Sequence, residues 1–208
     1  MLRARGFSLI EVVITMAIVG IALMAAIPVF NGWAQNMQIR SAADSAQNGL
    51  QYARAEALRR NTTVRFQLTT TVDNSCAIST GQSTWVVNLG SSTTNDPAAG
   101  CGATISPTVN QYSTTGSPFI LQRSEANGSP NVTVASNGVA ASMIIVFGAL
   151  GQVVYPATDS QFDFTNPNAG TCSTSTVSGV TCMRINVSVN GRIRMCNPAV
   201  ASGSPQGC

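Results

Sequence analysis

The residue of this 208-residue sequence that is best placed for chemistry near the N-terminus is Glu11, which lies inside an apolar run. No charged residue occurs between Val12 and Ile39, a stretch longer than the roughly 20 residues that cross a bilayer core. A carboxylate inside a membrane helix costs roughly 2.5–3.5 kcal/mol on insertion scales and needs a partner. Glu11 is therefore predicted to pair with a cation. The alternative is a position near the membrane interface, where the carboxylate reaches water.

The positive charges closest to Glu11 lie before the apolar run, in the short segment 1–6. A secretory signal has its cleavage site after its apolar region, whereas here the small residue Gly6 precedes that region. Cleavage after Gly6 would keep the apolar helix and create an α-amino group on Phe7. That amine, in the same chain or in a neighbouring copy, is the predicted partner of Glu11, and the pair would fix the register of stacked helices. The positive-inside tendency places the N-terminus in the cytoplasm and the rest of this single-pass chain outside the inner membrane.

A second candidate group consists of three arginines near the C-terminus, in a region without acidic residues. They are Arg184, Arg192 and Arg194. A hairpin loop that ends in a left-handed Gly191 places Val187 opposite Ile193, so that the three arginines share a polar face. Such a patch neutralises phosphates without reading bases and predicts weak, salt-sensitive DNA binding. The alternatives are solvated strand residues or contacts to a neighbouring subunit.

All six cysteines lie beyond position 75. An even number confined to the part that follows an apolar segment predicts disulfides formed in an oxidising compartment, with free buried thiols as the alternative. Because short loops close most readily, nearest neighbours are expected to pair. The expected bonds are Cys76–Cys101, Cys172–Cys182 and Cys196–Cys208.

The sequence has no histidine and no cysteines spaced as C-x-x-C, so a zinc site lacks its usual ligands. We expect neither a metal nor a cofactor. Without histidine, a Ser-His or Cys-His nucleophile is excluded. Asp159 and Asp163 are the alternative for catalysis, but they flank an aromatic, strand-like segment with turn chemistry and are interpreted as a loop and a solvated face. The chain is therefore not expected to be an enzyme.

Carrying these groups requires a long helix and a separate head. Small apolar residues continue with helical spacing after the membrane segment and predict a stripe that lies close against a sheet. They are Ile39, Ala43, Ala46, Leu50, Ala53 and Ala57. Two i,i+4 charge pairs, Arg40 with Asp44 and Glu56 with Arg60, are expected on the solvated side. The helix is expected to end near Asn61, with a soluble coiled coil as the alternative.

Beyond residue 61 the apolar period changes to two, which predicts short strands separated by turns. The expected strands surround Val64–Leu68, Trp85–Leu89, Val132–Val134 and Ile185–Val189, and the denser run Met143–Phe147 suits a central strand with Val153–Tyr155 as its partner. A charged fraction of only 9% is typical of a β-rich exported domain. The predicted class is α+β, a long N-terminal helix packed on an antiparallel β-sheet head.

The expected segments follow from these elements. They are a cleaved leader at 1–6, a membrane and assembly half of the helix at 7–33, an amphipathic half at 34–60 and a disulfide-bonded head at 61–208.

The residues Gly6-Phe7-Ser8-Leu9-Ile10-Glu11, followed by the apolar helix, resemble the processing motif of type IV prepilins and type II secretion pseudopilins. The resemblance implies the type IV pilin fold, cleavage after Gly6 by a prepilin peptidase, N-methylation of Phe7 and a role for Glu11 in filament assembly. Pro28 is similar to a helix-kinking proline common in these proteins. Other pilin or pseudopilin subunits are the implied partners, reached through the N-terminal helix.

Three further segments resemble the GspH/FimT group of minor pilins and pseudopilins. They are 39–64, 146–151 and the closing Asn190-Gly191-Arg192-Ile193-Arg194. The resemblance implies a subunit at or near a filament tip. Its FimT branch implies DNA capture through the Gly-Arg-x-Arg element, and its GspH branch implies a minor pseudopilin of type II secretion as the alternative.

Overall fold

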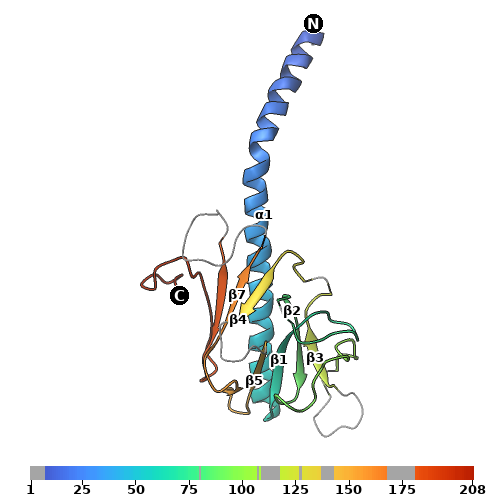
Figure 1. Ribbon diagram of the computed structural model, residues 1–208, viewed down its shortest axis with the longest axis vertical. Helices are drawn as coiled ribbons and strands as arrows, with labels where there is room; N and C mark the ends of the chain where they lie inside the picture. The colour runs from blue at the N-terminus through green and yellow to red at the C-terminus, as the bar shows by residue number, and fades with distance from the viewer. Residues whose placement is uncertain are drawn as a thin grey trace, which may run out of the picture.

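One helix, α1, runs without interruption from Leu9 to Arg60 and carries the head at its C-terminal end (Figure 1). The computed structural model describes residues 8–79, 81–106, 108, 118–126, 128–136, 143–167 and 181–208, without the side chains of 25–29 and 31. Within these residues, no helix has both the length and the apolar character required to cross a membrane.

The C-terminal half of α1 packs on the head through the predicted stripe of small residues. Ile39, Leu50, Ala53 and Ala57 are fully buried in the core. Gly49 allows the closest approach, since a Cβ atom there would lie 2.9 Å from Phe66 Cε2 and 3.0 Å from the indole ring of Trp85. The helix ends as predicted, because Asn61 adopts a left-handed conformation with φ 51° and donates its N–H to the carbonyls of the last turn.

The first sheet is antiparallel and five-stranded, in the order β3-β2-β1-β5-β6. Its strands are β1 (Val64–Thr69), β2 (Thr84–Leu89), β3 (Ile120–Arg123), β5 (Ile144–Phe147) and β6 (Val153–Tyr155). The alternating apolar residues of β1 and β2 face α1 in the core, and β6 pairs with β5 as predicted. Strand β3 was not predicted, because its four residues do not alternate clearly between apolar and polar.

A second antiparallel sheet has the order β4-β7-β8-β9, so the predicted antiparallel β head consists of two sheets. Its strands are β4 (Thr133–Ser136), β7 (Ser160–Thr165), β8 (Met183–Val187) and β9 (Ile193–Cys196). Both sheets contact α1. Strand β7 contains the aromatic segment that the sequence marked as strand-like, and it extends through Asp163 to Thr165.

The two sheets meet at the tip of the last hairpin. The Val153 N–H of β6 donates to the Val189 carbonyl at 2.9 Å. Gly191 has φ +82°, and a Cβ atom there would lie 1.9 Å from the Gly151 carbonyl oxygen. The Arg54 Nε donates to this same carbonyl at 3.1 Å, so one arginine of α1 holds the junction of the two sheets. A side chain on residue 191 would push the last hairpin away from Gly151 and so separate the two sheets.

Candidate functional site

Glu11 lies in the first turn of α1, where its carboxylate is exposed and faces the positive end of the helix dipole. Its backbone N–H donates to the Ser8 carbonyl at 3.1 Å. Gly6 and Phe7 lie outside the described residues, so the cleavage site and the pairing of Glu11 with the Phe7 amine stay predictions.

The N-terminal half of α1 exposes large apolar side chains on all sides. Leu9, Ile21 and Met24 are 82%, 72% and 78% exposed. No described residue of the head covers them, in contrast to the stripe of the C-terminal half. An exposed apolar surface of this kind is typical of a site that lipid or other helices cover. The side chain of Pro28 lies outside the described residues and the kink there stays a prediction, although Figure 1 shows that α1 curves.

The last hairpin has the register predicted from its sequence, with Val187 opposite Ile193 and Asn186 opposite Arg194. Arg184 shares the face of Arg194 as predicted, but β7 brings Asp163 opposite Arg184. The Arg184 Nε and Nη2 donate to the two carboxylate oxygens of Asp163 at 2.6 and 2.9 Å. Arg184 therefore links β8 to β7, and the Asp163 carboxylate compensates its charge.

Arg192 and Arg194 also lie on this face, and they differ in whether their guanidinium groups make hydrogen bonds to described residues. The Arg194 Nη2 donates to the carbonyls of Pro205 and Gly207, at 3.3 and 2.7 Å, and so holds the C-terminal tail. Arg192 is exposed, and no described residue accepts a hydrogen bond from its guanidinium. Both arginines line a shallow cavity of about 180 Å³ together with Asn186 and Ser188.

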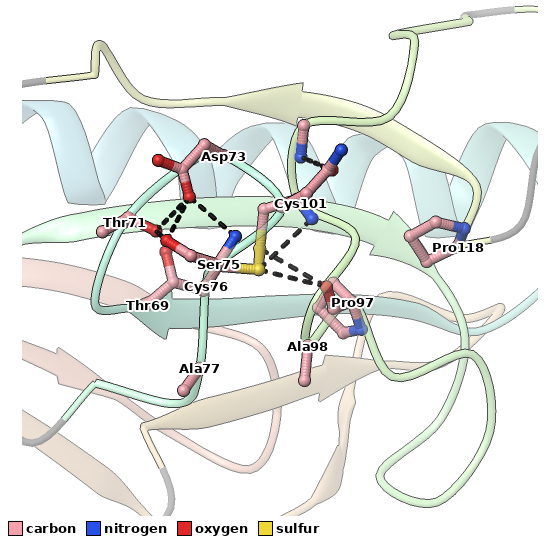
Figure 2. The surroundings of a disulfide bond; sticks show 12 residues. Thr69, Thr71, Asp73, Ser75, Cys76, Ala77, Pro97, Ala98, Cys101 and Pro118 are labelled. Carbon is pink, nitrogen blue, oxygen red and sulfur yellow. Dashed lines mark hydrogen bonds between the residues drawn. A yellow bond between two sulfur atoms is a disulfide. The ribbon is translucent and has the colours of Figure 1, made fainter.

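Two of the expected disulfides are present in the structure. Cys196 is bonded to Cys208, which fixes the tail that Arg194 holds. Cys76 is bonded to Cys101, and the Pro97 carbonyl lies beside the two sulfur atoms (Figure 2).

The third disulfide can be followed at one end only. Cys182 is disulfide-bonded, but its expected partner Cys172 lies outside the described residues, so that pairing stays a prediction.

The two carboxylates considered for catalysis have structural roles. Asp163 lies in β7 and is nearly buried against Arg184, which corrects its interpretation as a solvated residue. The Asp159 Oδ1 accepts the Val189 N–H at 2.9 Å and so fixes the start of the hairpin loop.

The pair predicted between Glu56 and Arg60 forms, but not on the solvated side. Glu56 is only 8% exposed and accepts hydrogen bonds from both Arg59 and Arg60, the latter at 2.6 Å. Burial acts to raise the pKa of this carboxyl, but the hydrogen bonds and charges of the two arginines outweigh burial and lower it. The i,i+4 spacing revealed the pair, whereas its burial depends on the head.

Sequence reasoning missed the buried Arg65 in β1. Its Nη2 contacts Gln67 Oε1 and lies 3.3 Å from the Asp96 carboxylate, and its Nη1 donates to the Ser91 carbonyl at 3.2 Å. Burial lowers the pKa of the guanidinium, and Asp96 opposes that effect. Arg65 lies on the sheet face that points away from α1, where the loop closed by Cys76–Cys101 covers it. The sequence showed only that Arg65 alternates with Val64 and Phe66 and so lies on the opposite face of β1 from them.

Comparisons with known proteins agree with this architecture. Residues 1–27 match the prokaryotic N-terminal methylation motif, and residues 42–191 match the family model of the type II transport protein GspH. The crystal structure of the type IV minor pilin FimU from Pseudomonas aeruginosa PAO1 in space group P21 is similar, with a TM-score of 0.50 and 19% sequence identity. That match covers 85% of this chain and 98% of the FimU chain.

A second FimU crystal structure, in space group P65, gives a TM-score of 0.46 and 20% identity over 81% of this chain and 98% of that one. No curated protein matches the sequence. At such low identity, the first FimU structure supports the fold alone, a long N-terminal helix packed on antiparallel sheets.

Proposed function

Because the chain belongs to the family of the type II transport protein GspH, a family of minor pilins and pseudopilins, we propose that it is a membrane-inserted subunit of a pilin-type filament. The observation that carries the proposal is the division of α1. Its N-terminal half lies largely within the match to the methylation motif and exposes apolar side chains, whereas its C-terminal half packs against the head. A filament buries the first half and displays the head. The role is structural rather than enzymatic.

Before assembly, the subunit resides in the inner membrane with its N-terminus in the cytoplasm and its head in the periplasm. The disulfides Cys76–Cys101 and Cys196–Cys208 support an oxidising compartment for the head. A prepilin peptidase removes residues 1–6 by cleavage after Gly6, and Phe7 is then N-methylated.

During assembly, Glu11 sets the axial register between neighbouring subunits. In the filament, the carboxylate of one subunit pairs with the Phe7 amine of its neighbour, because a shifted register leaves a buried charge without a partner.

Likeness to minor subunits supports a position at or near the filament tip, as a primer or an adaptor. A minor pseudopilin of type II secretion is the alternative, and the genes that adjoin this one distinguish the two systems.

The assembly role is tested with Glu11→Gln in the full chain, expressed in cells that make the filament. We expect the variant to be processed and to stay in the membrane but to be lost from sheared filaments. Asp44→Asn is the matched control, since Asp44 is an exposed carboxylate on the same helix. Incorporation of Glu11→Gln at the level of the control would show that the pairing is not needed.

A contribution to DNA binding is a second proposal, narrowed from three arginines to Arg192 with support from Arg194. It rests on the exposed guanidinium of Arg192 at the edge of the shallow cavity. A fragment that begins at residue 34 is expected to shift DNA at low salt, with binding that falls as salt rises. Arg192→Ala should weaken the shift more than Arg59→Ala, which removes the same charge from the end of α1. Equal effects would exclude a DNA site at the hairpin.

A further inference from the structure

An exposed aromatic pair on α1 lies immediately before the head. The rings of Phe30 and Trp33 have centroids 5.8 Å apart, and the two residues are 64% and 59% exposed. Met37 follows one turn later and is half-exposed. Residues spaced by three and four share one helix face, so these side chains form a continuous apolar strip. No described residue of the head covers it.

The head begins directly beyond this strip. The Asn36 Oδ1 accepts the Thr181 N–H at 2.6 Å, and the Gln38 carbonyl accepts the Ser129 hydroxyl at 3.4 Å. Among the residues that the structure describes, these hydrogen bonds join the head to α1 close to the aromatic pair. The pair therefore marks the boundary between the bare half of α1 and the half that the head covers.

The position of the pair along α1 matches the thickness of a bilayer. From Leu9 to Phe30 the helix rises about 32 Å at 1.5 Å per residue, and a hydrocarbon core is about 30 Å thick. A helix that enters the membrane near Leu9 thus brings Phe30 and Trp33 to the opposite interface. Tryptophan is enriched at membrane interfaces, because its indole combines an apolar ring with an N–H that needs a polar partner.

A cation, Arg40, lies on the same face, about 10 Å beyond Trp33 at 1.5 Å per residue. Arg40 follows Met37 by three residues, and helical side chains tilt towards the N-terminus, which here is the membrane side. Its guanidinium is exposed and lies 3.9 Å from the Asp44 carboxylate, a weak surface contact. Arg40 and Met37 also line a cavity of about 190 Å³ with Asn36, Thr181 and Met183, which has room for part of a headgroup.

We propose that Phe30, Trp33 and Arg40 form an interfacial anchor, in which the rings lie among the headgroups of the periplasmic leaflet and Arg40 binds lipid phosphate. The inference rests on the proposed insertion of α1 in the inner membrane. The anchor sets the depth of the subunit, because the head begins at Asn36 and rests on the membrane surface. The subunit is thereby held at a fixed height for its transfer to the filament.

Trp33 provides the test, because the chain has only two tryptophans. Trp85 is 3% exposed and donates its indole N–H to the Ser45 hydroxyl, so lipid does not reach it. The full chain is reconstituted in vesicles of phosphatidylcholine and phosphatidylglycerol that carry bromine at shallow or deep acyl positions. We expect shallow bromines to quench the emission more strongly than deep ones, and this quenching to disappear in Trp33→Phe.

Flotation of the vesicles separates failure of the anchor from failure of the proposed function. Protein that floats with the vesicles but is quenched best by deep bromines, or by neither, overturns the anchor and leaves membrane insertion intact. Protein that does not float overturns both. Arg40→Gln, with Asp44→Asn as its control, should reduce the gain in binding on addition of phosphatidylglycerol, and an unchanged gain would contradict the phosphate contact.

Discussion

The two halves of α1 share one unbroken helix and differ in what surrounds them. The N-terminal half presents large apolar side chains in all directions, and none of the described head residues covers them. The C-terminal half carries a stripe of mostly alanines that is buried against the two sheets, and only Met37 and Leu58 among its described large apolar residues are about half-exposed. The surface of the N-terminal half is suited to partners outside the chain, whereas the stripe of the C-terminal half packs against the head of the same chain.

The difference in residue size explains this division. Alanine and glycine bring the helix axis close to the sheets, and the aromatic residues of β1 and β2 fill the remaining space. Large side chains in the first half leave no such close approach, but they bury more surface in lipid or among packed helices. Enlarging a residue should therefore destabilise the head in the C-terminal half and leave it unchanged in the N-terminal half.

The largest effect is expected at the closest contact between α1 and the head, which is at Gly49. Gly49→Leu places a side chain within 3.0 Å of Phe66 and Trp85 and should destabilise the head by about 3 kcal/mol through overpacking. Gly20→Leu is the matched control, because nothing lies within 4 Å of its Cβ position. Thermal unfolding of the full chain in detergent, followed by near-ultraviolet circular dichroism, measures both. Equal melting temperatures would contradict the close packing of the second half.

An intermediate effect concerns the charged end of the buried half. Glu56→Gln should cost about 2 kcal/mol at neutral pH, because Arg59 and Arg60 lose their charged partner. Since folding lowers the pKa of Glu56, its contribution is present above the ordinary pKa of about 4.3 and is lost as pH falls through the lowered value. Denaturant unfolding of wild type and variant should therefore converge in acid.

Glu125→Gln serves as the control for Glu56, since Glu125 is an exposed carboxylate of the head. A stability difference between Glu56→Gln and wild type that stays constant from neutral pH into acid would mean that the ion pairs with Arg59 and Arg60 are not its source.

The smallest effect is expected at the solvated face of the same half. Asp44→Asn removes the weak contact with Arg40 and should change the free energy of unfolding by less than about 0.5 kcal/mol. The same denaturant titration measures it. A cost similar to that of Glu56→Gln would mean that the two i,i+4 pairs have similar surroundings, contrary to their burial.

The elements with a strong local period were predictable from the sequence. The stripe from Ile39 to Ala57 has helical spacing, and β1, β2 and the last hairpin alternate with period two, so each of them revealed its buried face. The hairpin register followed from one requirement, that Gly191 take a left-handed conformation. These features depend on neighbours within a few residues.

The features that depend on distant segments were missed. Asp163 and Arg184 are 21 residues apart and meet only because β7 pairs with β8. The aromatic residues made this segment strand-like, but Asp163 was assigned to a solvated face, because its partner Arg184 belongs to another strand. The division into two sheets likewise depends on long-range pairing, which no local period specifies.

The measurement that tests the account most directly is the mass of the N-terminal peptide of the protein isolated from the membrane fraction. The account predicts a chain that lacks residues 1–6 and begins at Phe7 with one added methyl group. A chain that keeps the leader, or one cut beyond the apolar run, would contradict it. In either case the amine proposed as the partner of Glu11 would not exist, and the exposed half of α1 would need another explanation.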